Sequence, residues 1–391
     1  MWSTPRNQSR FAGVITGETS KGSAVPPAQP DLLARVDRAR DPLGLFAILS
    51  KGMGHLVPFD AAVWRTVDPL TGLTTAPLRV DNLTEEGCAV YWQSELFEET
   101  VNRFTDLAEL PVPAAGLRET VGGLPTRSSL YRDFMRPRGL EDELRVVLRV
   151  DGAPWGQISL FRERGRRAFD SADTDVLGRM SAPLARRLRG FSRIPATSEP
   201  LRHSEPGVLL FDAAANLISI NDAAAEHLTQ VPEGPTVPTA WGVDIPIWIL
   251  TTVLRLRKPP FSQRHPGPRI RLRTRTGRWL VCHASSLRDA AGVVTGGTVV
   301  IEPAQATEVA ELIMAAYELS QRELDITALV AKGHATAQIA ARLYISPHTV
   351  RDHLKVVFEK VQVSSRGELV ARIFTDQLLS SVEEGTERHL T

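Results

Sequence analysis

The stretch YISPHTVRDHLKVVF, Tyr344 to Phe358, has the pattern of an amphipathic helix and decides the fold of the last part of the chain. Ser346 can cap the first free backbone N–H groups, and Pro347 suits the first helical position, where no N–H is needed. Helical spacing predicts a buried face made of Val350, Leu354, Val357, Phe358 and Val361. The opposite face is polar and contains His348, Arg351, Asp352, Lys355 and Glu359. Such a face contacts either water or a partner.

The surrounding sequence favours a partner. A short helix predicted over 336–343 ends just before this one, which is the layout of a helix-turn-helix. Ser320 and Glu323 form a capping box for an earlier helix over 321–332, and Gly333 can end that helix in a left-handed conformation. A compact core is expected from Ile326, Leu329, Val330, Ile339, Ala340, Leu343, Ile345, Val350 and Leu354. Mixed charge on one helix usually means solvation alone, but here the charged helix belongs to a complete small unit.

From Leu319 to Phe374 the sequence resembles the LuxR-type DNA-binding domain. The matching motif positions are Arg322-Glu323, Gly333, Ile339-Ala340, Ser346 to Val350, His353 to Lys360 and Ser365 to Leu369. The resemblance implies an all-α, four-helix helix-turn-helix domain whose recognition helix runs from Pro347 to Lys360. Two departures are Ala335, where a capping Ser is usual and only Thr336 could cap, and Tyr344, where Gly is common in the turn.

The resemblance places Arg351, Asp352 and Lys355 at the base-reading positions for double-stranded DNA. Their chemistry agrees, because Arg and Lys donate to guanine O6 and N7 and Asp accepts from cytosine N4. Residues three and four apart share a helical face, so the three can enter one major groove. The resemblance assigns backbone phosphates, or the orientation of the helix, to Thr336, Ser346, Thr349, His353, Lys360 and Ser365.

A last helix is predicted over 366–379, and by resemblance two copies of the domain meet there. The expected contact residues are Leu369, Val370, Ile373 and Phe374. A homodimer on an inverted-repeat operator follows from two-fold pairing of recognition helices, and RNA polymerase is a further candidate partner. Because residues 310–391 contain every matched motif and an apolar core, we also expect this part of the chain to need nothing from the upstream domains.

Composition narrows the class of protein. A length of 391 residues suggests two to four domains, and 42 % hydrophobic with 23 % charged residues is typical of a globular protein. The net charge of +1 gives no bulk attraction to nucleic acid or membrane, so any DNA contact must be local. Neither a bilayer-spanning apolar run nor a signal peptide is present, which favours a cytoplasmic protein without a membrane partner. Cys88 and Cys282 are far apart, and no metal site is predicted.

Upstream of the helix-turn-helix, alternating strand and helix patterns predict two α+β domains with antiparallel sheets. Residues 57–64 and 156–162 resemble a GAF domain, and residues 208–212 and 221–225 resemble a PAS domain. The whole order is similar to GAF–PAS–LuxR regulators of actinobacteria, which implies sensing of a small-molecule ligand in either domain. No ligand residue transfers, and no cofactor can be named. The predicted organisation is a disordered segment 1–30, a GAF-like domain 31–190, a linker 191–204, a PAS-like domain 205–302, a connecting helix 303–317, the LuxR-type domain 318–380 and a flexible tail 381–391.

Four arginines, Arg269, Arg271, Arg273 and Arg275, alternate with apolar residues in one strand of the PAS-like domain and therefore face one side. We expect a solvated sheet face there, in preference to an anion site. The adjacent pair Cys282-His283 points to opposite faces of a strand and is expected to be structural.

The sequence therefore predicts a sensory, DNA-binding transcriptional regulator without a catalytic site. Two alternatives remain. One is a ligand-responsive protein-interaction module that no longer binds DNA, against which Arg351 and Lys355 argue. The other is an enzyme with its centre in residues 31–190, although the chain has no phosphate-binding loop, zinc-protease or hydrolase-elbow motif.

Overall fold

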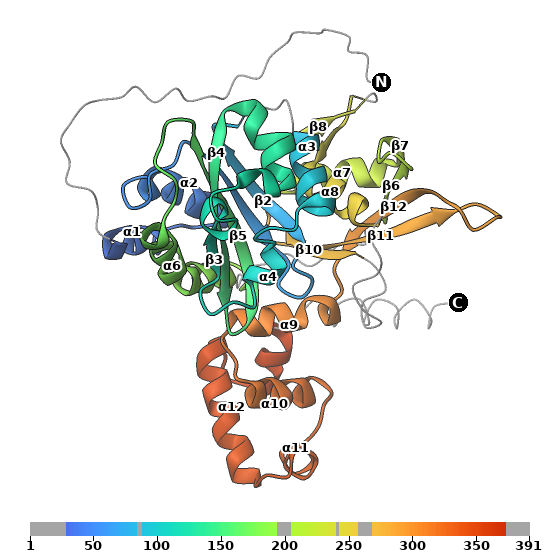
Figure 1. Ribbon diagram of the computed structural model, residues 1–391. Coiled ribbons are helices and arrows are strands. Elements are labelled where there is room, and N and C mark those ends of the chain that lie inside the picture. The colour runs from blue at the N-terminus through green and yellow to red at the C-terminus, as the bar shows by residue number, and fades with distance from the viewer. Residues whose placement is uncertain (1–28, 84–87, 194–204, 240–241, 257–267, 373–391) are drawn as a thin grey trace.

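The computed structural model describes residues 29–83, 88–193, 205–239, 242–256 and 268–372. Within these residues the chain forms two α+β units on antiparallel sheets and then a helical domain (Figure 1). The predicted fold class, two α+β regions followed by an all-α domain, is confirmed at this level.

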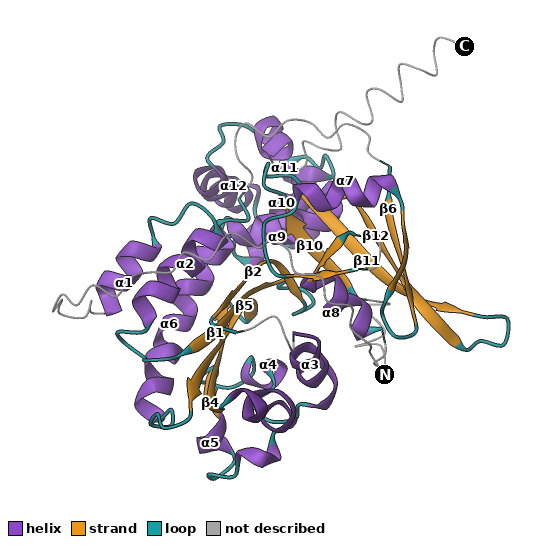
Figure 2. Ribbon diagram, turned by 90° about the horizontal axis from the view of Figure 1, so that it is seen from above, coloured by secondary structure: helices purple, strands orange, loops and turns teal. Residues whose placement is uncertain are grey.

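The first unit is built on a sheet that has the order β2-β1-β5-β4-β3 among the described residues. Its strands are β1 (Ala61–Val67), β2 (Thr74–Asp81), β3 (Ala114–Gly116), β4 (Leu140–Val150) and β5 (Ala153–Glu163). One face is covered by α1 (Gln29–Val36), α2 (Pro42–Met53) and α6 (Ser171–Gly190), the other by α3 (Cys88–Gln93), α4 (Phe104–Leu107) and α5 (Leu117–Thr120) (Figure 2). Strand β1 is buried on both faces, because Trp64 packs on the side of α1, α2 and α6 and Val63 packs on the side of α3 and α5.

The residue pattern of the first unit predicts a single helix over 84–107, and this prediction is wrong. After α3 the chain forms a π-helix, η1 (Ser94–Glu98), and then leaves the helical conformation until α4. The Glu99 carboxylate accepts hydrogen bonds from the backbone N–H groups of Thr100 (2.9 Å) and Val101 (2.7 Å), which stabilises the non-helical turn. The connection after α4 contains β3, α5 and three short helices, none of which was predicted: η2 (Pro125–Arg127), η3 (Tyr131–Met135) and η4 (Arg136–Arg138).

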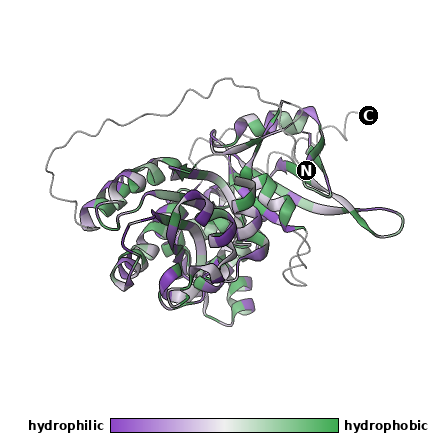
Figure 3. Cartoon of the chain, turned by 45° about the horizontal axis from the view of Figure 1, so that its top comes forward, coloured by the Kyte–Doolittle hydropathy of each residue, from purple (hydrophilic) through white to green (hydrophobic). Residues whose placement is uncertain are grey.

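The second unit repeats the strand order of the first, counted along each unit, because its described strands are arranged β10-β11-β12-β6-β7. Its elements are β6 (Gly207–Asp212), β7 (Leu217–Ile220), α7 (Asp222–Gln230), β8 (Thr236–Pro238), β9 (Asp244–Pro246), α8 (Ile247–Arg255), β10 (Arg269–Arg273), β11 (Trp279–Arg288) and β12 (Val294–Pro303). The β11–β12 hairpin projects from the body and ends in the exposed apolar residues Leu287, Val293 and Val294 (Figure 3).

The arginine face of β10 is packed against the first unit, so the prediction of a solvated face was wrong. Arg271 is 8 % exposed, and its Nη1 lies 2.8 Å from the Asp68 carboxylate at the end of β1. Thr75 of β2 donates a hydrogen bond to the Arg271 carbonyl (3.1 Å). Arg269 pairs with Glu308 at 2.6 Å, whereas Arg275 is exposed. Alternation in the sequence correctly put Arg269, Arg271 and Arg273 on one side of β10, but the first unit and Glu308 cover that side.

Helix α9 (Ala306–Ala316) lies between the two sheets and the helical domain (Figure 1). The domain consists of α10 (Gln321–Ala331), α11 (Thr336–Leu343), α12 (Pro347–Val361) and a further helical segment over 366–372. Val309, Leu312 and Ile313 of α9 belong to one buried apolar cluster that continues into both the upstream units and the domain core. Arg189 of α6 also pairs with Glu318 at 3.1 Å. The core of the helical domain is therefore continuous with the upstream units, and independence of residues 310–391 stays a prediction.

Candidate nucleic-acid interface

Helix α12 begins and packs as its sequence predicts. The Ser346 hydroxyl accepts a hydrogen bond from the Thr349 N–H (3.0 Å), and Pro347 occupies the first helical position. Val350, Val357 and Val361 have no exposed surface, Leu354 is 5 % exposed, and Phe358 is half-buried. The buried face fixes α12 against α10 and α11, so its opposite face has one defined orientation.

That opposite face contains the three predicted base-reading residues, all of them exposed: Arg351, Asp352 and Lys355. His348 Nδ1 lies 2.8 Å from a carboxylate oxygen of Asp352, one turn away on the same helix. Among the described residues, the side chains of Arg351 and Lys355 have no hydrogen-bond or ion-pair partner. The structure thus brings two unpaired cations and one oriented carboxylate together on the first turns of α12, beside α11.

The turn between α11 and α12 contains a residue that the sequence left without a role. Tyr344 ends α11 in the left-handed region (φ 54°) and is 95 % exposed. A non-glycine residue in this conformation costs on the order of 1–2 kcal/mol. Arg322 Nη2 donates to the neighbouring Leu343 carbonyl at 2.7 Å and satisfies the end of α11. This turn leaves a large aromatic side chain exposed between α11 and α12.

Lys360 and Glu323 fasten the far end of α12 to α10. Lys360 Nζ lies 2.7 Å from the Glu323 carboxylate and donates to the Glu318 carbonyl at 2.9 Å. Burial alone would raise the pKa of Glu323, but hydrogen bonds from Lys360 and from Ser320 hold that pKa below its usual value. The predicted capping box is present, since Ser320 N–H donates to Glu323 (2.7 Å) and Glu323 N–H donates to Ser320 (3.3 Å).

Thr336 and Ser365 are joined to the same framework. Arg366 Nη2 donates to the Thr336 hydroxyl (2.7 Å), and Arg366 Nη1 donates to the His334 carbonyl (3.1 Å). Thr336 is therefore not the cap of α11, as the sequence suggested; the cap position is Ala335, whose N–H donates to the Gln338 side chain at 2.9 Å. Ser365 accepts from the N–H of Glu368 (3.1 Å) at the start of the 366–372 helix.

The remaining predicted residues are less uniform. Thr349 and His353 are half-buried, and the Thr349 hydroxyl is 2.9 Å from that of Ser346. Leu369, expected at the contact between two copies, is 1 % exposed and packs inside the chain's own core, so a partner would not reach its side chain. Val370 is half-buried, and Ile373 and Phe374 lie outside the described residues.

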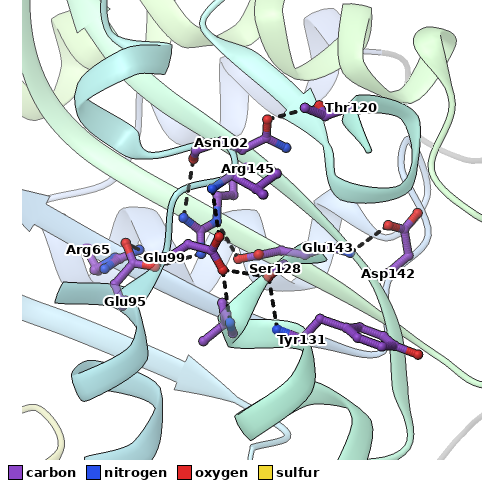
Figure 4. A network of polar contacts seen from close by, with 12 residues as sticks. Arg65, Glu95, Glu99, Asn102, Thr120, Ser128, Tyr131, Asp142, Glu143 and Arg145 are labelled. Carbon is purple, nitrogen blue, oxygen red and sulfur yellow. Dashed lines mark hydrogen bonds and ion pairs between the residues drawn. The ribbon is translucent and has the colours of Figure 1, made fainter. Parts of the chain in front are cut away.

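A second polar constellation lies inside the first unit and bears on the enzyme alternative (Figure 4). Arg145 of β4 lies 2.6 Å from Glu95 and 2.9 Å from Glu143, and Arg65 of β1 lies 3.8 Å from Glu95. These four side chains are only 2–8 % exposed. Burial raises the pKa of Glu143, although Arg145 opposes the shift. These four charged side chains pair with one another and connect the sheet to the layer that contains α3 and α4.

Two further absences concern the part of the chain that the structure describes. None of its helices combines the length and the apolar character required to cross a bilayer. Likewise, its His, Cys, Asp and Glu side chains form no group of three or more that could hold a metal ion.

Comparison with known proteins gives the domain its family. The model of "Bacterial regulatory proteins, luxR family" matches residues 317–373. Two curated relatives, the oxygen regulatory protein NreC of Staphylococcus carnosus and a probable transcriptional regulatory protein NarL of Mycobacterium tuberculosis, are each 39 % identical over 61 residues, which is 16 % of this chain and 28 % of theirs.

Other similarities are weaker or partial. A probable DNA ligase of Anaeromyxobacter dehalogenans is 26 % identical over 160 residues, covering 41 % of this chain and 31 % of the ligase. The crystal structure of Escherichia coli SdiA is similar over 88 % of this chain and 94 % of SdiA, with 13 % identity and a TM-score of 0.32. The chain thus spans less than a third of the length of the curated relatives that it matches.

The family model covers the helices α10, α11 and α12, which form the helix-turn-helix domain. The C-terminal domain of this chain, residues 317–373, belongs to the luxR family of DNA-binding bacterial regulatory proteins.

Proposed function

We propose that the chain is a transcriptional regulator whose helix α12 reads the major groove of DNA through Arg351, Asp352 and Lys355. The observation that carries this proposal is the exposed face of α12, which presents unpaired cations from a helix fixed on its other side in a luxR-family core.

Each of the three residues has a chemical role in this proposal. Arg351 and Lys355 donate to guanine O6 and N7, and Asp352 accepts from the amino group of cytosine. The contact with His348 Nδ1 orients the Asp352 carboxylate on the exposed face of the helix, where it can meet a base.

The polar residues around α12 position it on the phosphate backbone. Ser346, Thr349, His353 and Ser365 are the proposed phosphate contacts. Thr336 and Lys360 act on helix orientation, because their side chains are already bound by Arg366 and Glu323. We add Tyr344 to the phosphate contacts, since it is exposed and lies in the turn just before α12.

We propose that the chain acts as a homodimer on an inverted-repeat operator. Pairing through the helix that begins at 366 would use Val370, Ile373 and Phe374, with Leu369 supporting the helix from inside. Two-fold symmetry then separates the half-sites by about one helical turn of DNA. RNA polymerase is a candidate second partner, and the site of action is the cytoplasm.

The two upstream units are proposed to be sensory domains, the first GAF-like and the second PAS-like. Their common strand order supports a shared architecture. Both units contact α9 or its flanks, through Arg189 in the first and Arg269 in the second. A change in either unit would therefore reach the helical domain through α9.

The test is selection of bound fragments from a random DNA library by the purified full-length protein. The proposal expects one enriched motif with inverted symmetry and an affinity that falls with salt, because phosphate contacts release counterions. If no motif is enriched at any salt concentration, the proposal fails and the protein-interaction alternative takes its place.

A further inference from the structure

A cavity of about 680 Å³ lies at the junction of the two upstream units, outside the helix-turn-helix. Its walls come from the ends of β1, β2 and α6 in the first unit, from β10 and β11 in the second, and from Leu312 of α9. Pockets of roughly 300–1,000 Å³ hold drug-sized ligands. The cavity is therefore large enough for a small organic molecule.

The apolar part of the wall is formed by long side chains from three different segments. Leu43 lies in the first turn of α2, Leu188 in the last turn of α6, and Leu312 in α9. The two indole rings of Trp155 and Trp279 complete this wall. A ligand that fits here needs an apolar or aromatic body.

One positive charge in the wall is not neutralised by the protein. The buried pair of Arg271 and Asp68 cancels within itself. Arg273, beside it on the same strand, donates to the carbonyls of Gly277 (3.1 Å) and Phe191 (2.5 Å). Among the described residues no carboxylate pairs with Arg273, and its Nη2 group makes no hydrogen bond. Burial lowers the pKa of Arg273, as expected for a guanidinium without a counter-charge.

Two hydrogen-bond donors in the same wall are also unsatisfied. Trp155 and Trp279 are 4 % and 8 % exposed, yet the indole N–H of each is without an acceptor in the described part of the chain. A buried donor that remains unpaired costs about 1–3 kcal/mol. Arg273 therefore calls for a negatively charged acceptor, and the indole N–H groups of two residues that line the same cavity call for further acceptors.

We propose that this cavity is a binding site for a small organic anion, with an aromatic or aliphatic body and a carboxylate or a similar oxyanion. Arg273 binds the oxyanion, the indole N–H groups donate to further acceptor atoms, and the leucines contact the body. The charges at the rim agree in sign, since Arg40, Arg193 and Arg275 outnumber Asp41 and Glu233.

The site spans both units, so it differs from a ligand pocket inside either one. It also touches α9 directly through Leu312, whose neighbours in the apolar cluster extend into the helical domain. Occupation of the cavity would fix the position of the two units and of α9 relative to one another. This inference does not depend on DNA binding, and its test uses no DNA.

The test compares two fluorescent probes that share one ring system. The anion 8-anilinonaphthalene-1-sulfonate has the proposed chemistry, and N-phenyl-1-naphthylamine lacks the sulfonate. Both are titrated into the full-length protein and into three variants. Arg273→Gln removes the charge, Trp155→Phe removes one indole N–H but keeps an aromatic ring, and Arg288→Gln is the control. Arg288 is an exposed arginine of β11 that does not line the cavity. Thermal melting of each variant confirms that it folds.

The expected result is saturable 1:1 binding of the anionic probe, weakened about tenfold by Arg273→Gln, as for loss of a charge-assisted hydrogen bond. Trp155→Phe should weaken it several-fold, while Arg288→Gln and the neutral probe show no such dependence. Equal affinity of the anion for wild type and a folded Arg273→Gln variant would overturn the proposal. So would absence of saturable binding, or equal sensitivity of both probes to Arg273.

Discussion

Replacing Asp68 with asparagine should destabilise the junction between the two upstream units more than any exposed charge change. The Asp68 side chain has no exposed surface, and that of Arg271 is 8 % exposed. One carboxylate oxygen of Asp68 accepts from Arg271 Nη1 (2.8 Å) and from the Arg271 N–H (2.9 Å). The substitution leaves a buried guanidinium without its counter-charge. Breaking such a pair costs about 3–5 kcal/mol, far more than the pair contributes over an apolar replacement.

The assay is urea unfolding, followed by tryptophan fluorescence and circular dichroism on the same samples. Asp106→Asn is a matched control, because Arg103 and Asp106 pair at 2.8 Å with side chains 55 % and 48 % exposed. An exposed pair contributes about 0.2–1 kcal/mol, so this control should hardly shift the unfolding free energy. The double variant Asp68→Asn, Arg271→Gln should recover part of the loss, and the single variant Arg271→Gln completes the mutant cycle. If Asp68→Asn costs no more than Asp106→Asn, the junction is not held as described.

Three further predictions concern the helical domain. Val350→Asp should unfold it, because the new carboxylate replaces a side chain with no exposed surface. Val356 is 38 % exposed on the same helix, so the control Val356→Asp should melt like wild type. Equal melting temperatures of the two variants would mean that the buried face was misassigned. Because the pKa of Glu323 is depressed in the folded protein, its pairing stabilises the domain above the unfolded pKa of 4.5, and this contribution is lost as the pH falls through the folded value. Glu323→Gln should therefore lower the melting temperature at neutral pH and converge with wild type in acid, and a gap that widens in acid would contradict the sign. Arg366→Ala should lower the free energy of local unfolding at the start of α11 by about 1–3 kcal/mol, since it removes donors to Thr336 and to the His334 carbonyl. Unchanged hydrogen-exchange protection in α11 would count against this role.

Helical periodicity was enough to predict α12, because a 3.6-residue pattern specifies both the helix and its buried side. The helix caps at Ser320 and Ser346 could also be predicted, since the residues that they bind are only three positions away in the sequence. The helix predicted over 84–107 failed for the opposite reason. Its interruption depends on Glu99, which also accepts from Ser128 (2.5 Å) on a distant segment.

The arginines of β10 illustrate the same limit at a longer range. Strand alternation determines which side chains share a face, but it says nothing of what covers that face. The partner of Arg271 is 203 residues away in sequence. The burial of Arg65 and Arg145 was not predicted either. An arginine in a strand is expected to be exposed, and the sequence alone does not show which carboxylates will pair with it.

For the candidate interface, sequence could supply the residue types but not their surroundings. Arg351, Asp352 and Lys355 lie on one exposed face, as the spacing predicts. For Lys360 the sequence left open a phosphate contact or a role in helix orientation, and only the structure shows that it is bound to Glu323. Tyr344 was noted only as a departure from glycine, and its 95 % exposure depends on the turn geometry.

The most direct test of DNA reading by α12 is a binding titration on the selected operator, monitored by fluorescence anisotropy at two salt concentrations. The double variant Arg351→Ala, Lys355→Ala is compared with Lys51→Ala, Arg164→Ala, which removes the same charges from exposed positions of the first unit. Each lost base contact is worth about 1–3 kcal/mol, so the α12 variant should bind at least about tenfold more weakly, with wild-type melting. The control variant should bind like wild type. Equal operator affinity of the two double variants would contradict the assignment of α12 as the reading helix.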